Sequence, residues 1–292
     1  MRIPLYWSKA TAKRPGSQGR LASFSCWRSS DVSEEDAQRS ALAAAKSALQ
    51  LFAARKSLGR YPYGCGNVPL REEVIQRFEN SQGDLYAAVT RNGYGSLVLN
   101  SARAMFIDID FPNPFWGSPW GTLKYLFGRL LGKPAWSPDA QQDDAKNRLE
   151  EFLHERPAWG MRIYRTCGGL RGLVTHDLFD PAADTTLAAL QAVGADPMYV
   201  RLCKAQECFR ARLTPKPWRC GHLVNRSAWP RDDAEQQQQF DQWLAAYMTR
   251  QSQFATCRLL GTLGSSTVHP EIETVIEVHD EITRCREPLV LA

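Results

Sequence analysis

The chain has 292 residues, of which 43% are hydrophobic and 23% charged, a composition typical of globular proteins that excludes disorder of the whole chain. The formal net charge is +5, and no apolar run is long enough for a signal peptide or a membrane span. Eight cysteines without a secretory signal predict free thiols or metal ligands rather than a disulfide framework. We therefore expect a soluble, cytoplasmic protein.

The N-terminal part of the chain is predicted to be partly helical. Residues 1–30 look irregular or strand-like. Ser33 followed by three acidic residues is a good helix start, and the alanines and leucines after it extend this helix to about residue 56. A second helix is expected from Pro69, with its apolar side chains facing inward.

A run of strand-like sequence follows, and it is broken by Asn92-Gly93, a strong signal for a hairpin turn. We expect strands over residues 85–90, 97–99 and 105–111. The next segment, residues 112–138, is rich in proline and tryptophan and is interpreted as an insertion or a large loop. Within it, residues 123–131 have the pattern of a short basic amphipathic helix.

The second half of the chain alternates helices with hairpins. We expect a helix over 139–155, strands over 160–166 and 170–175, helices near 181–193 and 233–250, a strand over 257–263 and a helix ending near 284. Hairpins outnumber β-α-β units, which favours an α+β fold with a largely antiparallel or mixed sheet flanked by helices. Residues 1–83 would then be a helical or irregular segment packed on a catalytic core of residues 84–292.

Asp108 and Asp110 end an apolar strand, and alternation along a strand places both carboxylates on the same face. Their Cα atoms would be roughly 7 Å apart, so both side chains could reach one metal ion or a close pair of ions. Two ionised carboxylates in this position repel each other, and a divalent cation relieves the repulsion. Oxygen ligands indicate Mg²⁺ or Mn²⁺. The alternative is a structural pair that contacts arginines or caps a helix.

A second constellation surrounds Gly168 and Gly169, where a glycine turn allows backbone N–H groups to approach an anion. Arg165 and Arg171 flank this turn and are predicted to clamp phosphate oxygens. His176 follows at a strand end, where it could bind phosphate or act as an acid or a base. The alternatives are an ordinary hairpin turn and a structural histidine.

A third region combines cysteines with basic residues. The spacing suits a zinc site formed by Cys203, Cys208, Cys220 and His222, and buried thiols are the alternative. Six basic side chains stand against one acid between residues 201 and 219, which indicates a footprint for phosphates or a solvated strip. Single-stranded nucleic acid or a nucleotide is expected to be bound by Arg210, Arg212, Lys216, Trp218 and Arg219.

An apolar strand ending in Asp108 and Asp110, followed by a strand–glycine turn–strand unit, resembles the archaeo-eukaryotic primase family, also called primase-polymerases. The resemblance covers about residues 84–180 and implies an α+β core that joins nucleotides on a template with two metal ions. Nucleotides and single-stranded or primer-template nucleic acid are the implied partners. The whole pattern also resembles an uncharacterised bacterial protein family.

The chain departs from the primase-polymerase pattern at two points. The family has a phosphate-binding histidine after the glycine turn, whereas here Arg171 stands near that position and His176 comes later. The family's third motif, an apolar residue before a metal-binding aspartate, has no clear match, and Asp280 is the candidate.

Three functions follow as hypotheses. The first is a Mg²⁺- or Mn²⁺-dependent nucleotidyltransferase of the primase-polymerase type, with Asp108, Asp110 and His176 as catalytic residues. The second is a phosphohydrolase of the haloacid-dehalogenase type, whose first aspartate is a nucleophile, although that family places its motif near the start of a parallel α/β domain. The third is a non-catalytic nucleic-acid-binding protein, with or without a zinc staple, in which the acids are structural.

Overall fold

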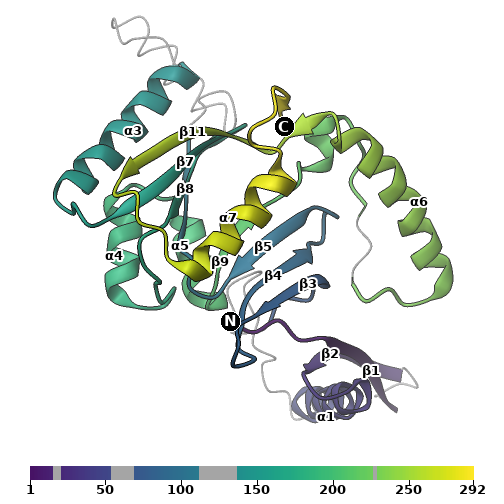
Figure 1. Ribbon diagram of the computed structural model, residues 1–292. Coiled ribbons are helices and arrows are strands. Elements are labelled where there is room, and N and C mark those ends of the chain that lie inside the picture. The colour runs from purple at the N-terminus through teal and green to yellow at the C-terminus, as the bar shows by residue number, and fades with distance from the viewer. Residues whose placement is uncertain (16–20, 54–68, 112–136, 226–228) are drawn as a thin grey trace, which may run out of the picture.

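The computed structural model describes residues 1–15, 21–53, 69–111, 137–225 and 229–292. Its described part is a mixed α+β structure with two four-stranded antiparallel sheets flanked by helices (Figure 1). This arrangement confirms the fold class and the antiparallel pairing expected from the hairpins. Among the described residues, no helix is long and apolar enough to cross a membrane.

The first sheet carries the acidic strand and has the order β11-β7-β8-β6. Its strands are β6 (Phe106–Asp110), β7 (Gly160–Thr166), β8 (Gly169–Val174) and β11 (Cys257–Gly264). Helix α3 (Pro138–His154) packs against one face. The opposite face meets α5 (Pro197–Gln206), where the Tyr199 hydroxyl donates to the carbonyl of Phe106, and α7 (Pro270–Thr283), where the rings of Phe106 and His279 are 5.5 Å apart.

The second sheet has the order β3-β4-β5-β9. Its strands are β3 (Glu73–Glu79), β4 (Leu85–Arg91), β5 (Leu97–Ser101) and β9 (Phe209–Arg212). The helix expected from Pro69 is wrong, because this segment enters β3 and pairs with β4 through Val74 and Phe78. The β-branched Val74 and Ile75 favour a strand once β4 offers a pairing edge. Strand β9 was not expected, and it brings two arginines beside β5.

The N-terminal unit is a hairpin of β1 (Tyr6–Pro15) and β2 (Leu21–Ser30) that packs on α1 (Glu34–Ala53). The predicted helix start is confirmed, since the Ser33 hydroxyl oxygen accepts a hydrogen bond from the backbone N–H of Asp36 at 3.2 Å. Ala12 of the hairpin and Ala45 and Leu49 of the helix form its small core. Residues 1–30, which were expected to be irregular or strand-like, thus contain a regular antiparallel hairpin.

The other described elements are short or lie at the periphery. They are α4 (Asp184–Ala192), the 3₁₀ helix η2 (Pro217–Cys220), α6 (Ala234–Gln251), β10 (Phe254–Ala255) and β12 (Val290–Leu291). The predicted helices near 181–193 and 233–250 correspond to α4 and α6. The expected short helix at 123–131 and most of the proline- and tryptophan-rich insertion lie outside the described residues, as does the end of the first predicted helix.

Candidate functional site

The two strand aspartates share one face of the first sheet, as the alternation predicted. Asp108 of β6 pairs with Arg171 of the neighbouring strand β8, and Asp110 pairs with Gly169 of the same strand. Ile107 and Ile109 are buried on the opposite face. Asp108 is half-buried in the middle of the edge strand β6, and Asp110 is exposed at the end of the same strand.

A third carboxylate lies near this pair. Asp196 caps the N-terminus of α5, where its side chain accepts a hydrogen bond from the backbone N–H of Tyr199 at 2.8 Å, and its own N–H donates to the carbonyl of Asp108 at 2.8 Å. Sequence reasoning missed this residue. The signal was present, since an aspartate before Pro197 is a helix cap followed by a proline in the first turn.

The charged state of the acid pair is disfavoured. Burial raises the pKa of Asp108, and the negative charge of Asp196 raises it further against the opposing pull of Arg171 and Arg212. Burial also raises the pKa of Asp110, and the charges of Asp108 and Asp196 add to that rise. A bound cation would reverse both shifts, because it favours ionised carboxylates.

A set of cations faces these acids. Arg171 comes from β8, Arg212 from β9, and Lys216 and Arg219 from the segment that forms η2. Burial lowers the pKa of Arg212 to about 10, and the nearby charge of Arg171 contributes. Burial also lowers the pKa of Lys216, as do Arg212 and Arg219. Cations that depress one another's pKa favour an anionic ligand among them.

A cavity of about 260 Å³ lies between α5 and the two sheets. Its lining includes Asp108 and Asp196 together with the arginine side chains of β8 and β9. Arg210 and Arg212 line it, and the Nη1 atom of each is buried without a hydrogen-bond partner in the described part of the chain. Arg210 is otherwise held by Glu72, whose carboxylate accepts two hydrogen bonds from its Nη2 at 2.8 and 2.9 Å. Unpaired guanidinium donors beside carboxylates suit a ligand that carries both an anion and a cation.

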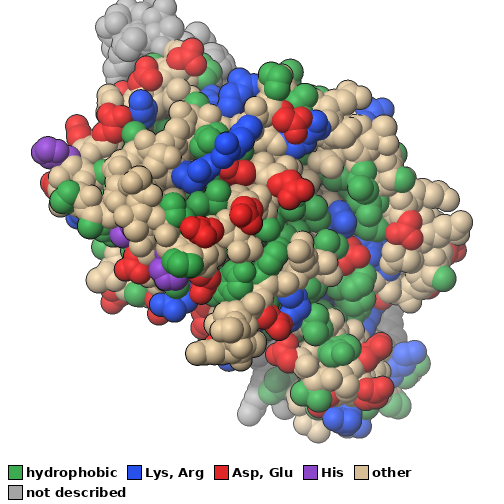
Figure 2. Space-filling model, in the orientation of Figure 1, with side chains coloured by type: hydrophobic (Ala, Val, Ile, Leu, Met, Phe, Trp, Pro, Cys, Tyr) green, Lys and Arg blue, Asp and Glu red, His purple; other side chains and the backbone are tan. Residues whose placement is uncertain are grey.

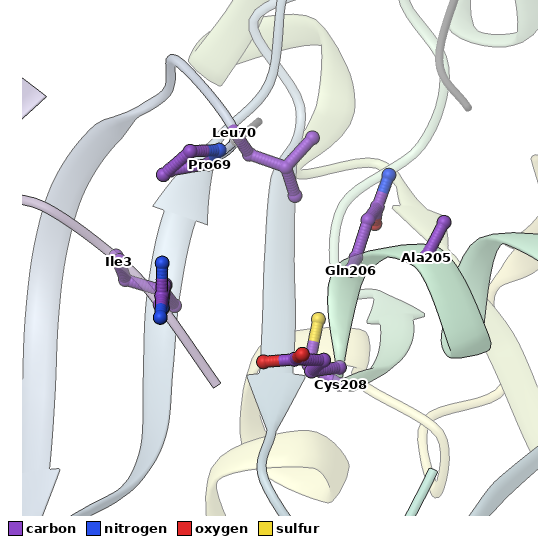
Figure 3. A pocket seen from close by; sticks show the side chains of 8 residues that line it. Ile3, Pro69, Leu70, Ala205, Gln206 and Cys208 are labelled. Carbon is purple, nitrogen blue, oxygen red and sulfur yellow. The ribbon is translucent and has the colours of Figure 1, made fainter. Parts of the chain in front are cut away.

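A smaller hollow of about 130 Å³ lies at the C-terminal end of α5 (Figure 3). Ile3 and Pro69 approach it from the N-terminal segments, and Gln206 and Cys208 approach it from the end of the helix. Apart from Cys208, it contains none of the predicted site residues. The cavity beside Asp108 is therefore the better candidate for chemistry.

Behind Arg171 lies a buried polar network that the sequence did not predict. The Nη1 of Arg171 donates to the carbonyl of Arg212 at 2.9 Å and to Nε2 of the fully buried His279 at 3.1 Å. The Nδ1 of His279 then donates to Asp280 at 3.2 Å, and the Tyr164 hydroxyl donates to the same carboxylate at 2.7 Å. This chain fixes the guanidinium opposite Asp108.

The same network defines the role of Asp280. Although burial opposes ionisation, the hydrogen bonds from His279 and Tyr164 and the charge of Arg162 lower the pKa of Asp280 to about 2. Burial lowers the pKa of His279 to about 4, so this ring is neutral at pH 7. Asp280 therefore forms an ion pair with Arg162 and supports Arg171 through His279, which gives it a structural role in place of the expected role as third metal ligand.

The predicted clamp of Arg165 and Arg171 does not form. Arg165 pairs with Leu170 and Arg171 pairs with Tyr164, which places the two arginines on opposite faces of the sheet. Arg165 donates to the carbonyls of Thr166 and Gly169 at 2.6 and 2.8 Å and so closes the turn. Arg171 alone reaches the acidic face.

The two glycines of the turn have different roles. A Cβ atom on Gly169 would lie 1.9 Å from the carbonyl oxygen of Ile109, so only glycine allows β8 to approach β6 there. A Cβ atom on Gly168 would lie 3.4 Å from the Nη2 of Arg219 and 3.9 Å from a carboxylate oxygen of Asp110. Gly168 therefore borders the acidic site, while Gly169 serves the packing of the sheet.

His176 lies away from the acid pair, at the opposite end of β7 from the glycine turn. Its Nδ1 accepts a hydrogen bond from the backbone N–H of Gly160 at 3.4 Å, and its ring packs against Trp159 at 4.8 Å and Phe179 at 5.6 Å. The structure gives this histidine the structural role that was its alternative, and not the predicted role in catalysis.

The four expected zinc ligands do not converge. Among the described residues, no three histidine, cysteine or acidic side chains are placed to hold one metal ion. Cys220 donates to the carbonyl of Pro217 at 3.2 Å, and His222 packs on Trp243. Burial raises the pKa of Cys203 to about 12 and that of Cys208 to about 11, so both remain thiols. The seven cysteines among the described residues are free thiols.

The face of the molecule drawn in Figure 2 mixes charges of both signs. On the face drawn in Figure 2, acidic side chains gather over α7 and basic ones lie beside them, so this face carries no uniform positive patch. The cluster of Lys216, Arg212 and Arg219 is therefore a more specific indication of an anion-binding site than the net charge of +5.

Comparisons of the chain with family models, with curated proteins and with solved structures found no match.

Proposed function

We propose that this protein is a Mg²⁺- or Mn²⁺-dependent nucleotidyltransferase of the primase-polymerase type that acts on nucleotides or nucleic acid. The observation that supports it most is the shared face of Asp108, Asp110 and Arg171, with Lys216 within electrostatic reach of both acids. A metal ion bound to a phosphate group satisfies the carboxylates and the cations together, whereas either alone would leave one set uncompensated.

Asp108 and Asp110 would be the protein ligands of the ion. Mg²⁺ is often bound by one or two carboxylates together with water and substrate phosphates, so a pair is sufficient. When bound, the ion supplies Lewis acidity toward a phosphoryl group. Asp196 adds negative charge beside the pair, and in the described residues it does not complete a three-ligand group.

Arg171, Arg212 and Lys216 would bind the phosphates of the substrate. Arg171 is held in place by Arg212 and His279 through one nitrogen, which leaves its other guanidinium donors for a ligand. Arg212 lines the cavity, and its buried Nη1 has no hydrogen-bond partner in the described part of the chain. Arg171 thereby takes the position after the glycine turn where the resemblance implied a phosphate-binding histidine.

The two other hypotheses have less support. A haloacid-dehalogenase-type phosphohydrolase implies a parallel sheet around the acidic strand, and β6 pairs antiparallel with β8. A zinc-stapled binding protein implies convergent cysteines, which the described residues lack. A nucleic-acid-binding protein without zinc differs from the proposed enzyme because it needs no metal ion and therefore no ionised Asp108.

A primer-extension assay with labelled nucleotides and either Mn²⁺ or Mg²⁺ tests the proposal. We expect extension that requires the metal and that falls at least about a hundredfold in Asp108→Ala, as loss of metal-centred stabilisation implies. Asp31→Asn, which changes an exposed acid elsewhere, is the matched control.

Extension that survives Asp108→Ala would overturn the metal assignment. If no extension occurs and a generic phosphate ester is hydrolysed instead in an Asp108-dependent way, the phosphohydrolase becomes the better hypothesis.

A further inference from the structure

Two exposed aromatic side chains form a pair near the acidic site. Tyr94 lies in the turn between β4 and β5, and Trp218 lies in η2; they are 45% and 47% exposed. Their ring centroids are 5.3 Å apart and the rings are nearly perpendicular. A single exposed aromatic residue is ordinary on a protein surface, but a contacting pair from distant parts of the chain requires an explanation.

The pair is held in place by the backbone around it. The Asn92 side chain accepts hydrogen bonds from the N–H groups of Tyr94 at 3.0 Å and Ser96 at 3.2 Å, which fixes the turn. The Ser96 hydroxyl then donates to the carbonyl of Pro215 at 2.9 Å, just before η2. Since the turn and η2 are tied together, the aromatic pair is preorganised, and binding a ligand there would cost little ordering entropy.

Positive charge accompanies the rings. The Nζ of Lys216 lies 5.5 Å from the centroid of the Trp218 ring. Arg219 follows directly and reaches the rim of the acidic site beside Gly168. Cations next to exposed aromatic faces are the pattern by which proteins bind single strands, with bases stacked on the rings and phosphates paired with the cations.

The aromatic pair is linked to the cavity beside Asp108 through neighbouring residues, although neither ring lines that cavity. Asn92, which fixes the turn, also lines that cavity, and Lys216 acts on the pKa of both Asp108 and Asp110. A cavity of about 260 Å³ is small for a whole nucleotide, since ligand pockets commonly exceed roughly 300 Å³. Phosphates in this cavity would leave the attached bases at its rim.

We propose that Tyr94 and Trp218 form a stacking platform for unpaired bases of single-stranded nucleic acid, with Lys216 and Arg219 binding its phosphates. The identity of that strand as the one on which the acidic site acts rests on the proposed function. Binding itself does not, because stacking and phosphate pairing need no metal ion.

Fluorescence anisotropy with labelled oligodeoxythymidylate and oligouridylate, recorded at low salt in the presence of EDTA, tests the platform. We expect Trp218→Ala and Tyr94→Ala each to weaken binding about tenfold, the size typical of one lost stacking contact. Trp218→Phe keeps an aromatic face and should retain most of the affinity. Tyr6→Ala removes an aromatic residue of similar exposure (39%) from β1 and should bind as the wild type does.

Three results would overturn the platform: wild-type affinity in both alanine variants, equal affinity for a duplex and a single strand, or no binding of either oligonucleotide. Circular dichroism of each variant separates a local effect from misfolding. EDTA removes divalent metal ions, so this assay measures binding by the platform independently of the metal site. Binding without nucleotidyl transfer would support the platform alone, and transfer without platform-dependent binding would support the metal site alone.

Discussion

The backbone N–H of Asp196 donates to the carbonyl of Asp108 at 2.8 Å, so the N-terminus of α5 is docked on the acidic strand. The positive end of the helix dipole therefore lies beside Asp108, where it favours negative charge. The same contact brings the carboxylate of Asp196 within electrostatic reach of both strand acids. One hydrogen bond thus links the fold of α5 to the charge balance of the candidate site.

Variants of Asp196 separate its capping role from its charge. Asp196→Ala removes the side chain that accepts from Tyr199 and should lower the free energy of unfolding by about 1 kcal/mol. Asp196→Asn keeps a good cap and should cost much less, although both variants remove the same charge. Urea denaturation measures the difference, and equal losses in the two variants would refute the capping role.

Neutralising Asp110 should stabilise the metal-free protein. Because its folded-state pKa is raised, its contribution favours folding below the ordinary value of 3.8 and is lost as the pH rises through the folded pKa. At pH 7 the ionised group therefore disfavours folding, and Asp110→Asn should raise the melting temperature by about 2 °C in EDTA. A lower melting temperature in the variant would count against the repulsion on which the metal proposal depends.

The stabilising effect of His279 should depend on pH. Its folded-state pKa of about 4 lies below the ordinary 6.5, so its contribution is fully present above pH 6.5 and is lost as the pH falls toward 4. The span corresponds to about 3 kcal/mol. We expect the difference in unfolding free energy between the wild type and His279→Gln to shrink over this interval.

The comparison with His279→Gln cancels the opposite pH dependence of Asp108 and Asp110, because both proteins contain these acids. Parallel curves for the two proteins between pH 7 and pH 4.5 would show that His279 does not change its protonation there, contrary to the buried neutral ring inferred from its contacts with Arg171 and Asp280.

The two turn glycines should respond differently to alanine. In Gly169→Ala the new Cβ would meet the carbonyl oxygen of Ile109 at 1.9 Å, so β6 and β8 must separate, at a cost of about 3 kcal/mol. In Gly168→Ala the nearest atom is the mobile end of Arg219 at 3.4 Å, and a change within about 0.5 kcal/mol is expected. Chemical denaturation of both variants provides the test, and equal stabilities would contradict the close approach at Gly169.

Local patterns predicted much of the fold. Apolar alternation and the signals at Asn92-Gly93 and Gly168-Gly169 placed β4 to β8 within about a residue or two of their ends, and the serine cap placed α1. The segment from Pro69 was misassigned, although its partner β4 follows directly after residues 80–84, because Val74, Ile75 and Phe78 fit the spacing of a helix face as well as that of a short strand.

The site was harder to predict because it depends on register. Arg165 and Arg171 are six positions apart, and in one continuous strand this spacing would place them on the same face. Here a tight turn lies between them, so they belong to two paired strands and face opposite sides of the sheet. Strand β9 is only four residues long, and its arginines looked like part of a basic strip. His279 shows no sequence signal for contact with Arg171, since that contact depends on how α7 packs across the sheet.

Binding of Mn²⁺, followed by electron paramagnetic resonance in the presence of a nucleoside triphosphate, tests the metal site most directly. Free Mn²⁺ gives a strong signal that falls when the ion is bound. A matched titration without protein subtracts the Mn²⁺ that the nucleotide binds by itself, so the difference counts the sites that require the protein. We expect saturable binding in the wild type and in Asp31→Asn, and at least tenfold weaker binding in Asp108→Asn and in Asp110→Asn, since each removes a carboxylate ligand. Unchanged Mn²⁺ affinity in both strand variants would contradict the assignment of Asp108 and Asp110 as ligands of a catalytic metal ion.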